Sequence, residues 1–219
     1  MAITPKLAAF AAAAFFAVST IPASTATAHP HAWIDVTVEV LFNDDGAATG
    51  LRERWQFDEF YTAFALEGLG TGGAQNPTQE ELDEIVRVNV TNIESYYYFT
   101  EVEHAGVFIG FDTSKEMSAV YEDNRLEMIF VVPFEEPLDM STSSLTYGIF
   151  DPTYYIEMLH APVDQPVVLV NAPRDCSAEI EEASPTFEAI SLAATVDQMD
   201  STGLQLGTLF AERVTVACS

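Results

Sequence analysis

Residues 32 to 42 read AWIDVTVEVLF and alternate between apolar and polar side chains along almost their whole length. The even positions are Ala, Ile, Val, Val, Val and Phe, and the odd positions include Trp33, Asp35, Thr37 and Glu39. A period of two predicts a β-strand with one face on a hydrophobic core and the other toward solvent. The sequence NDDG at 43–46 predicts a turn. The alternate positions Leu51, Glu53, Trp55 and Phe57 then predict a second strand, which completes a β-hairpin.

The rest of the chain continues this pattern after two predicted helices. Asp58 can cap a helix that runs to about Gly68, with Phe60, Ala63 and Phe64 on one side, and Thr78 with Glu81 forms a capping box for a second helix. Further strands are predicted at about residues 98–104, 107–112, 117–122, 125–133, 144–150, 154–160, 166–171, 176–182 and 211–218. Residues 184–208 show no clear pattern beyond some helical character. Many short strands favour a mainly β fold, an antiparallel, immunoglobulin-like β-sandwich with a two-helix insertion at about 58–97.

The first 28 residues have the features of a secretory signal peptide. Lys6 lies before an apolar stretch from Leu7 to Val18, and a small-residue segment ends in Ala26-Thr27-Ala28, an A-x-A cleavage pattern. The apolar stretch is too short to span a membrane, which takes about 20 residues. We therefore expect cleavage after Ala28, and an exported mature chain 29–219 that forms one domain without a membrane span.

The charge and the cysteines restrict the partners and the covalent structure. The sequence has 34 Asp and Glu against 8 Lys and Arg, so binding to nucleic acid or anionic lipid is not expected, and a solvated acidic surface is the simplest interpretation. Cys176 and Cys218 are the two cysteines, and in an exported chain they predict a disulfide. A thiolate metal site is the weaker alternative, because the chain has no C-x-x-C motif.

Two of the four histidines, His29 and His31, stand at the predicted mature N-terminus. His29, His31 and Asp35 share one strand face, where residues two apart are about 7 Å apart. Both imidazoles can therefore bind one ion, with Asp35 as a further ligand or as a hydrogen-bond acceptor from an imidazole. A free amine on His29 would add a nitrogen ligand suited to Cu(II). Pro30 has no amide hydrogen, so Cu(II) cannot bind there through a deprotonated backbone amide. The alternative is a pair of surface histidines with no ligand role.

Three other residues have both a functional and a structural interpretation. His160 ends the segment DPTYYIEMLH and either joins the metal ligands in an aromatic-lined site or caps a strand. Asp151 either accepts a hydrogen bond from a metal ligand or forms an Asx-type turn with Pro152 and Thr153. His104 is predicted to be a surface histidine at a strand end.

Several motifs occur together in an order found in a known family. They are HPHAWID at 29–35, WQFDEFYTAF at 55–64, YFT at 98–100, FDPTYYIEM at 150–158 and AERVTVAC at 211–218. In these motifs the chain resembles the bacterial exported family named domain of unknown function 1007. The resemblance implies a periplasmic component of an ABC-type transport system, often encoded beside nickel/cobalt-type metal transporters. By this resemblance, His29, His31 and Asp35 are the residues of this chain that match the family pattern.

One departure from that family bears on calcium. Many members carry an EF-hand-like loop between the two helices, where this chain has GTGGAQNPTQEE at 70–81. Such a loop needs oxygen ligands at its first, third and fifth positions, and here these are Gly70, Gly72 and Ala74. Glu81 keeps the twelfth position but is already used in the capping box. No calcium is expected at residues 70–81.

The sequence thus predicts a periplasmic accessory protein that binds Zn, Ni, Co or Cu near its N-terminus and serves a membrane metal transporter. It contains no nucleophile elbow, zincin motif, P-loop or dinucleotide fingerprint, so an enzyme is not favoured. Two alternatives stay open. One is a copper enzyme with an N-terminal histidine on a β-sandwich, and the other is a metal-free periplasmic interaction module.

Overall fold

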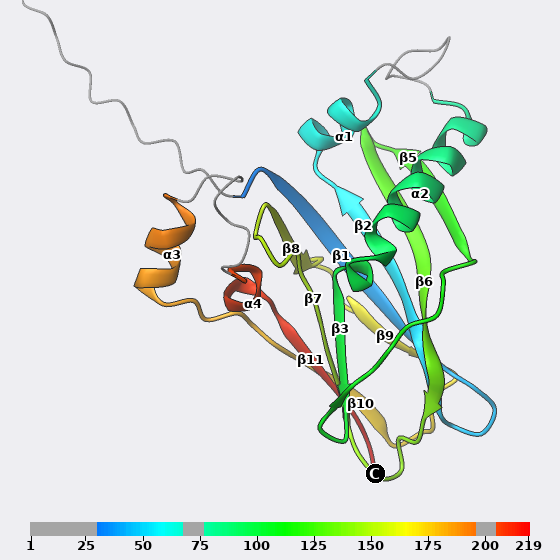
Figure 1. Ribbon diagram of the computed structural model, residues 1–219. Coiled ribbons are helices and arrows are strands. Elements are labelled where there is room, and N and C mark those ends of the chain that lie inside the picture. Colours follow the sequence, from blue (N-terminus) through cyan, green and yellow to red (C-terminus); the bar gives the residue numbers. More distant parts are fainter. Residues whose placement is uncertain (1–29, 68–76, 196–204) are drawn as a thin grey trace, which may run out of the picture.

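The computed structural model describes residues 30–67, 77–195 and 205–219 (Figure 1). The predicted signal peptide, His29 and the positions Gly70, Gly72 and Ala74 of the calcium-loop comparison lie outside these described residues.

The chain is mainly β and forms two sheets (Figure 1). The first sheet has the order β5-β6-β2-β1-β8, with β9 also paired to β1. Its strands are β1 Ala32–Phe42, β2 Ala48–Phe57, β5 Met117–Glu122, β6 Arg125–Leu138, β8 Ile156–His160 and β9 Val167–Val170. The second sheet has the order β10-β11-β7-β3-β4. Its strands are β3 Thr100–His104, β4 Val107–Phe108, β7 Leu145–Ile149, β10 Cys176–Glu181 and β11 Arg213–Cys218.

Two pairings correct the prediction of a purely antiparallel fold. β8 and β9 both run parallel to β1, with Ala32 opposite Ile156 and Val38 opposite Val167. The segment between β8 and β9 contains Pro162 and Pro166, and a proline cannot donate to a strand ladder, so the pairing with β1 is interrupted there. The direction of a strand relative to a distant neighbour is set by how the chain crosses between the sheets, which local patterns do not encode.

The two sheets share one hydrophobic core. The even positions of β1 are buried as the alternation predicts. One cluster joins Val36 and Phe130 of the first sheet to Val102, Tyr147 and Val214 of the second. Burial of these apolar side chains on both inner faces stabilises the sheets against each other.

Within the described residues, four α-helices accompany the sheets: α1 Glu59–Ala65, α2 Gln79–Glu94, α3 Phe187–Ala193 and α4 Gly207–Phe210. A short 3-10 helix, η1, covers Tyr97–Phe99. The predicted capping box of α2 is confirmed, because the Thr78 hydroxyl accepts from the Glu81 amide and the Glu81 carboxylate accepts from the Thr78 amide. α2 buries Leu82, Val86 and Val90 and packs on β5 (Figure 1). α3 lies within residues 184–208, for which the sequence showed no clear pattern, and α4 begins at the end of that region.

The apolar side of α1 points to solvent. Phe60, Ala63 and Phe64 are exposed, whereas Thr62 and Leu66 are buried. Thr62 is on the inner side because its hydroxyl accepts a hydrogen bond of 3.0 Å from the buried amide of Leu126 in β6. The buried side of this short helix therefore combines this polar contact with Leu66, and it is not the side that carries Phe60 and Phe64.

The predicted disulfide is confirmed. Cys176 and Cys218 lie opposite each other in β10 and β11, with an S–S distance of 2.01 Å. Among the described residues, none of the helices combines the length and the apolar character that a membrane crossing requires.

Candidate functional site

His31 stands on the outer face of the first sheet, immediately before β1. Its amide donates a hydrogen bond of 2.8 Å to the carbonyl of Tyr155. Its imidazole stacks on the Tyr155 ring with centroids 4.8 Å apart. The side chain is exposed, so the contacts with the segment before β8 orient the ring while leaving it at the surface.

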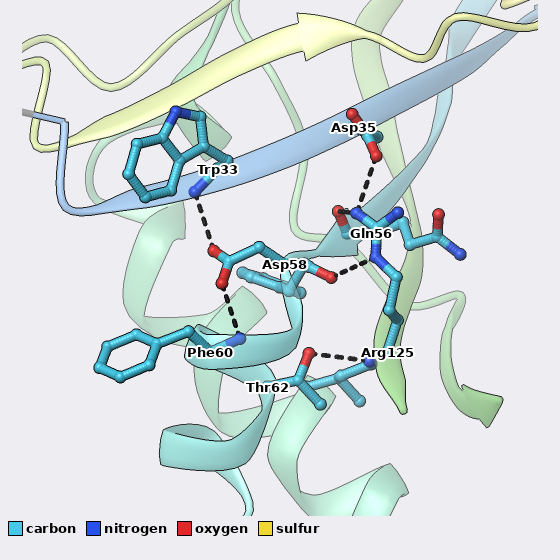
Figure 2. Close-up of polar contacts among 9 residues, drawn as sticks. Trp33, Asp35, Gln56, Asp58, Phe60, Thr62 and Arg125 are labelled. Carbon is cyan, nitrogen blue, oxygen red and sulfur yellow. Dashed lines mark hydrogen bonds and ion pairs between the residues drawn. The ribbon is translucent and has the colours of Figure 1, made fainter. Parts of the chain in front are cut away.

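Asp58 connects three elements where β1 begins (Figure 2). Its Oδ2 accepts from the amide of Trp33 at 3.0 Å, and its own amide donates to the Trp33 carbonyl at 3.0 Å. Its Oδ1 caps α1 by accepting from the amides of Phe60 and Tyr61 at 2.8 and 2.9 Å. The carboxylate therefore joins the start of β1 to the first turn of α1, and the backbone amide of Asp58, just after β2, adds a second contact with β1.

Replacing Asp58 with alanine is expected to destabilise the protein by about 1–2 kcal/mol, since a helix cap of this kind contributes about that much. Asp58→Asn is the matched control, because an amide oxygen can still cap α1 while its NH2 group cannot accept from the Trp33 amide. Urea denaturation of both variants should therefore place Asp58→Asn between wild type and Asp58→Ala. Equal stability of all three would show that the contacts of Asp58 contribute nothing.

Asp35 forms an ion pair with Arg125 (Figure 2). Its Oδ2 accepts a hydrogen bond of 2.7 Å from Nη2 of Arg125 in β6. The same guanidinium donates from Nε to the carbonyl of Phe57 at 2.7 Å and from Nη2 to that of Gln56 at 3.2 Å. A metal ligand role for Asp35 would have to compete with this ion pair.

His160 faces the space between the sheets, on the opposite side from His31. It lies in register with Val36 of the core, and its side chain is only 7% exposed. Its Nδ1 and its amide each contact Oε2 of Glu212 at 2.7 Å. Its Nε2 lies 3.5 Å from the hydroxyl of the buried Tyr147. Burial raises the pKa of Glu212 and the hydrogen bonds from His160 lower it, with a net lowering.

Asp151 has the contacts of its structural interpretation. It is 5% exposed and accepts hydrogen bonds from the amide of Thr153 at 2.9 Å and from the amide of Ile156 at 3.1 Å. These contacts close the turn that leads into β8. His104 has its Nδ1 3.2 Å from the carbonyl of Ser144, at the end of β3.

The predicted site residues that the structure describes therefore do not come together in one site. His31 and Asp35 share the outer face of the first sheet, and Asp35 pairs with Arg125. His160 points inward and pairs with Glu212. Within residues 30–67, 77–195 and 205–219, no group of three His, Cys, Asp or Glu side chains is arranged to hold a metal ion.

The core also contains a buried acidic residue for which the sequence predicts no role. Glu53 is fully buried, with Oε2 accepting from the indole of Trp55 at 2.9 Å and Oε1 lying 2.8 Å from the Thr100 hydroxyl. Burial raises the pKa of Glu53 to about 8, although both hydrogen bonds lower it. Burial, followed by the charges of Glu53 and Glu212, also raises the pKa of Tyr147. The sequence indicated this burial, because Glu53 alternates with the apolar residues Leu51, Trp55 and Phe57 on one face of its strand.

Comparison with known proteins agrees with the motif resemblance. The chain is similar to an uncharacterized protein of Haemophilus influenzae, with 24% identity over 193 residues that cover 87% of this chain and 91% of that protein. The family described as "Protein of unknown function (DUF1007)" matches residues 14–218. This match spans nearly the whole sequence, and both sheets lie within it. The chain therefore belongs to the DUF1007 family.

Proposed function

We propose that the protein is a periplasmic accessory protein that binds a transition metal as cargo at its mature N-terminus and serves a membrane metal transporter. The observation that carries the proposal is the position of His31, an exposed imidazole on the outer face where β1 begins. A second histidine, His29, precedes it by two residues. The motif resemblance to a family associated with metal transporters supports the same function.

The surroundings restrict the ligand set that fits. Asp35 is held by Arg125 and His160 by Glu212, so neither is directed to His31. The donors that fit best are the imidazoles of His29 and His31 and the N-terminal amine. An α-amine with a pKa near 8 is a good ligand once deprotonated, and with its own imidazole it forms a chelate ring. Such an all-nitrogen set suits Cu(II), Ni(II) or Zn(II).

A copper enzyme built on the same ligands is the second candidate. Its support is Trp33, which is 49% exposed two residues after His31 on the same face. An indole beside a metal can stack on a planar or sugar-like substrate, as aromatic side chains do in many binding sites. Turnover of such a substrate with copper bound, and a redox-active copper signal, would favour this candidate over a carrier.

We further infer that the two sheets form an immunoglobulin-like sandwich. The shared core of Val36, Phe130, Tyr147 and Val214 supports this arrangement, as aligned sheets pack their inner faces together. The parallel strands β8 and β9 would then be an addition at one edge of the first sheet.

Metal titration tests the proposed function. The mature chain, with its first residue identified by intact mass, is titrated calorimetrically with Zn(II), Ni(II) and Cu(II). We expect binding of one ion that weakens at least tenfold in the His29→Ala, His31→Ala variant. His104→Ala is the matched control, because it removes a histidine from the other sheet. Equal binding by all three proteins would refute the N-terminal site and favour a metal-free interaction module.

A further inference from the structure

A groove with a volume of about 940 Å³ runs between α1 and α2. Five apolar side chains line it: Tyr61, Phe64, Ala65, Ile85 and Val88. Four carboxylates line it as well: Glu80, Glu81, Asp83 and Glu84. The groove therefore combines an apolar surface with an acidic border.

Two of the apolar side chains in the groove are exposed, whereas Tyr61, Ala65 and Ile85 also pack against the core. Phe64 is 67% exposed and Val88 is 38% exposed. One turn before Phe64, Phe60 is 81% exposed and extends the apolar surface along α1. Phe60 and Phe64 are spaced by four residues, so they lie on one helix face. Exposed aromatic residues on a rigid helix are typical anchors of protein interfaces.

The charge around the groove specifies the kind of partner. Among the described residues that line it, Arg87 is the one cationic side chain, and it is paired with Glu84 through Nε and Oε2 at 2.8 Å. Glu81 is held in the capping box. Glu80 and Asp83 are exposed, and the whole sequence carries 34 acidic against 8 basic residues. A basic partner gains from this field, whereas an acidic one is repelled.

We propose that the groove between α1 and α2 binds a cationic amphipathic helix of a partner protein. The apolar face of that helix packs on Phe64, Ile85 and Val88, and its Lys or Arg side chains face Glu80 and Asp83. This is the helix-in-groove mode of recognition. α2 has 16 residues, so it offers a length of about 24 Å, or about four helical turns. The proposal is independent of metal binding at the N-terminus.

The probe is a fluorescein-labelled synthetic helix of 16 residues, about the length of α2, with Leu at i, i+3, i+4 and i+7 spacing and Lys elsewhere. A scrambled peptide of the same composition has the same charge without an apolar face. Fluorescence anisotropy is measured with the full mature protein. We expect the amphipathic peptide to bind at least tenfold more tightly than the scrambled one, and added salt to weaken it. Equal affinities would mean attraction by net charge alone and would overturn the proposal.

Matched variants locate the site. Phe64→Ala with Val88→Ala is expected to weaken binding at least tenfold. Phe187→Ala with Leu192→Ala changes two exposed apolar side chains of α3 and should leave binding unchanged. All four side chains are exposed, so far-UV circular dichroism should report unchanged folding. Equal losses in both double variants would overturn the proposal.

The charged border is tested in the same way. Glu80→Gln with Asp83→Asn should weaken binding several-fold, whereas Glu179→Gln with Glu181→Gln on β10 should not.

The residues 68–76, which connect α1 to α2 in sequence, are an alternative occupant that a variant can test. A variant with a Gly-Ser linker of equal length in their place should bind the peptide as the wild type does. Much tighter binding by this variant would show that the chain itself occupies the groove and would overturn the proposal.

Discussion

Replacing Glu53 with glutamine is expected to stabilise the protein at neutral and alkaline pH. The carboxyl has a pKa of about 8 in the folded protein against 4.5 for an ordinary Glu. Between these two values the folded chain binds a proton that the unfolded chain has lost. The stability of the wild type therefore falls by up to about 1.4 kcal/mol per pH unit as the pH rises from 4.5 to 8. Glutamine has no such proton and escapes this loss.

The hydrogen bonds around Glu53 also suit a neutral side chain. Trp55 donates to Oε2. The Thr100 hydroxyl lies 3.0 Å from the carbonyl of Tyr98 and can donate to it, leaving its oxygen to accept from a protonated Oε1 at 2.8 Å. A glutamine NH2 group can donate in the same place. The substitution should thus keep the network and leave no buried polar atom without a partner.

The measurement is urea denaturation of wild type and Glu53→Gln at several pH values between 4.5 and 9. The difference in unfolding free energy should grow with pH and level off above the folded pKa of about 8. Glu103→Gln, at an exposed position of β3, is the control and should show no such trend. A difference that stays constant across the whole range would contradict a neutral buried Glu53.

Removal of the disulfide is expected to lower the free energy of unfolding by an amount similar to the whole pH-dependent loss at Glu53. Cys176 and Cys218 are separated by 42 positions, and opening a loop of that length lowers the unfolding free energy by roughly 4 kcal/mol in the chain-entropy model. The bond joins the end of β11 to the start of β10, an edge strand without a fully buried residue. Without the bond we expect β10 to separate first.

Denaturation of Cys176→Ser with Cys218→Ser, compared with wild type in the presence and absence of reductant, measures this contribution. Reduced wild type should match the double variant, and the reductant should leave the variant unchanged. The same stability for oxidised and reduced wild type would show that packing alone holds β10 in place.

Local patterns were sufficient for much of the fold. The alternation in β1 identified its buried face, the capping box identified the start of α2, and the predicted strands at 117–122 and 125–133 left Asp123-Asn124 as the turn between β5 and β6. That turn has positive φ angles of 50° and 61°, which Asn and Asp adopt more easily than most residues. In each case the information lies within a few neighbouring residues.

Other features depend on contacts that sequence patterns do not report. Tyr97, Tyr98 and Phe99 all have positive φ angles, which aromatic residues rarely adopt. Their conformation accompanies the burial of Tyr98, whose hydroxyl accepts from the Ser114 amide at 2.9 Å. The side of α1 that is buried likewise depends on a contact of Thr62 with β6.

The candidate site shows the same division. The sequence could place His31 and Asp35 on one strand face, since residues of equal parity share it. It could not predict that Arg125 would reach Asp35 from β6, or that Glu212 would meet His160 between the sheets. Both contacts join residues far apart in the chain, and only the packed fold brings them together.

The parallel strands beside β1 also determine the order in which the protein can fold. β1 comes at the start of the described chain, and one of its two edges is completed only by β8 and β9. Until those residues are available, β1 has an open edge that can pair with another chain. Such long-range pairing makes folding slow. A chaperone that shields this strand while the rest of the chain emerges would therefore reduce aggregation.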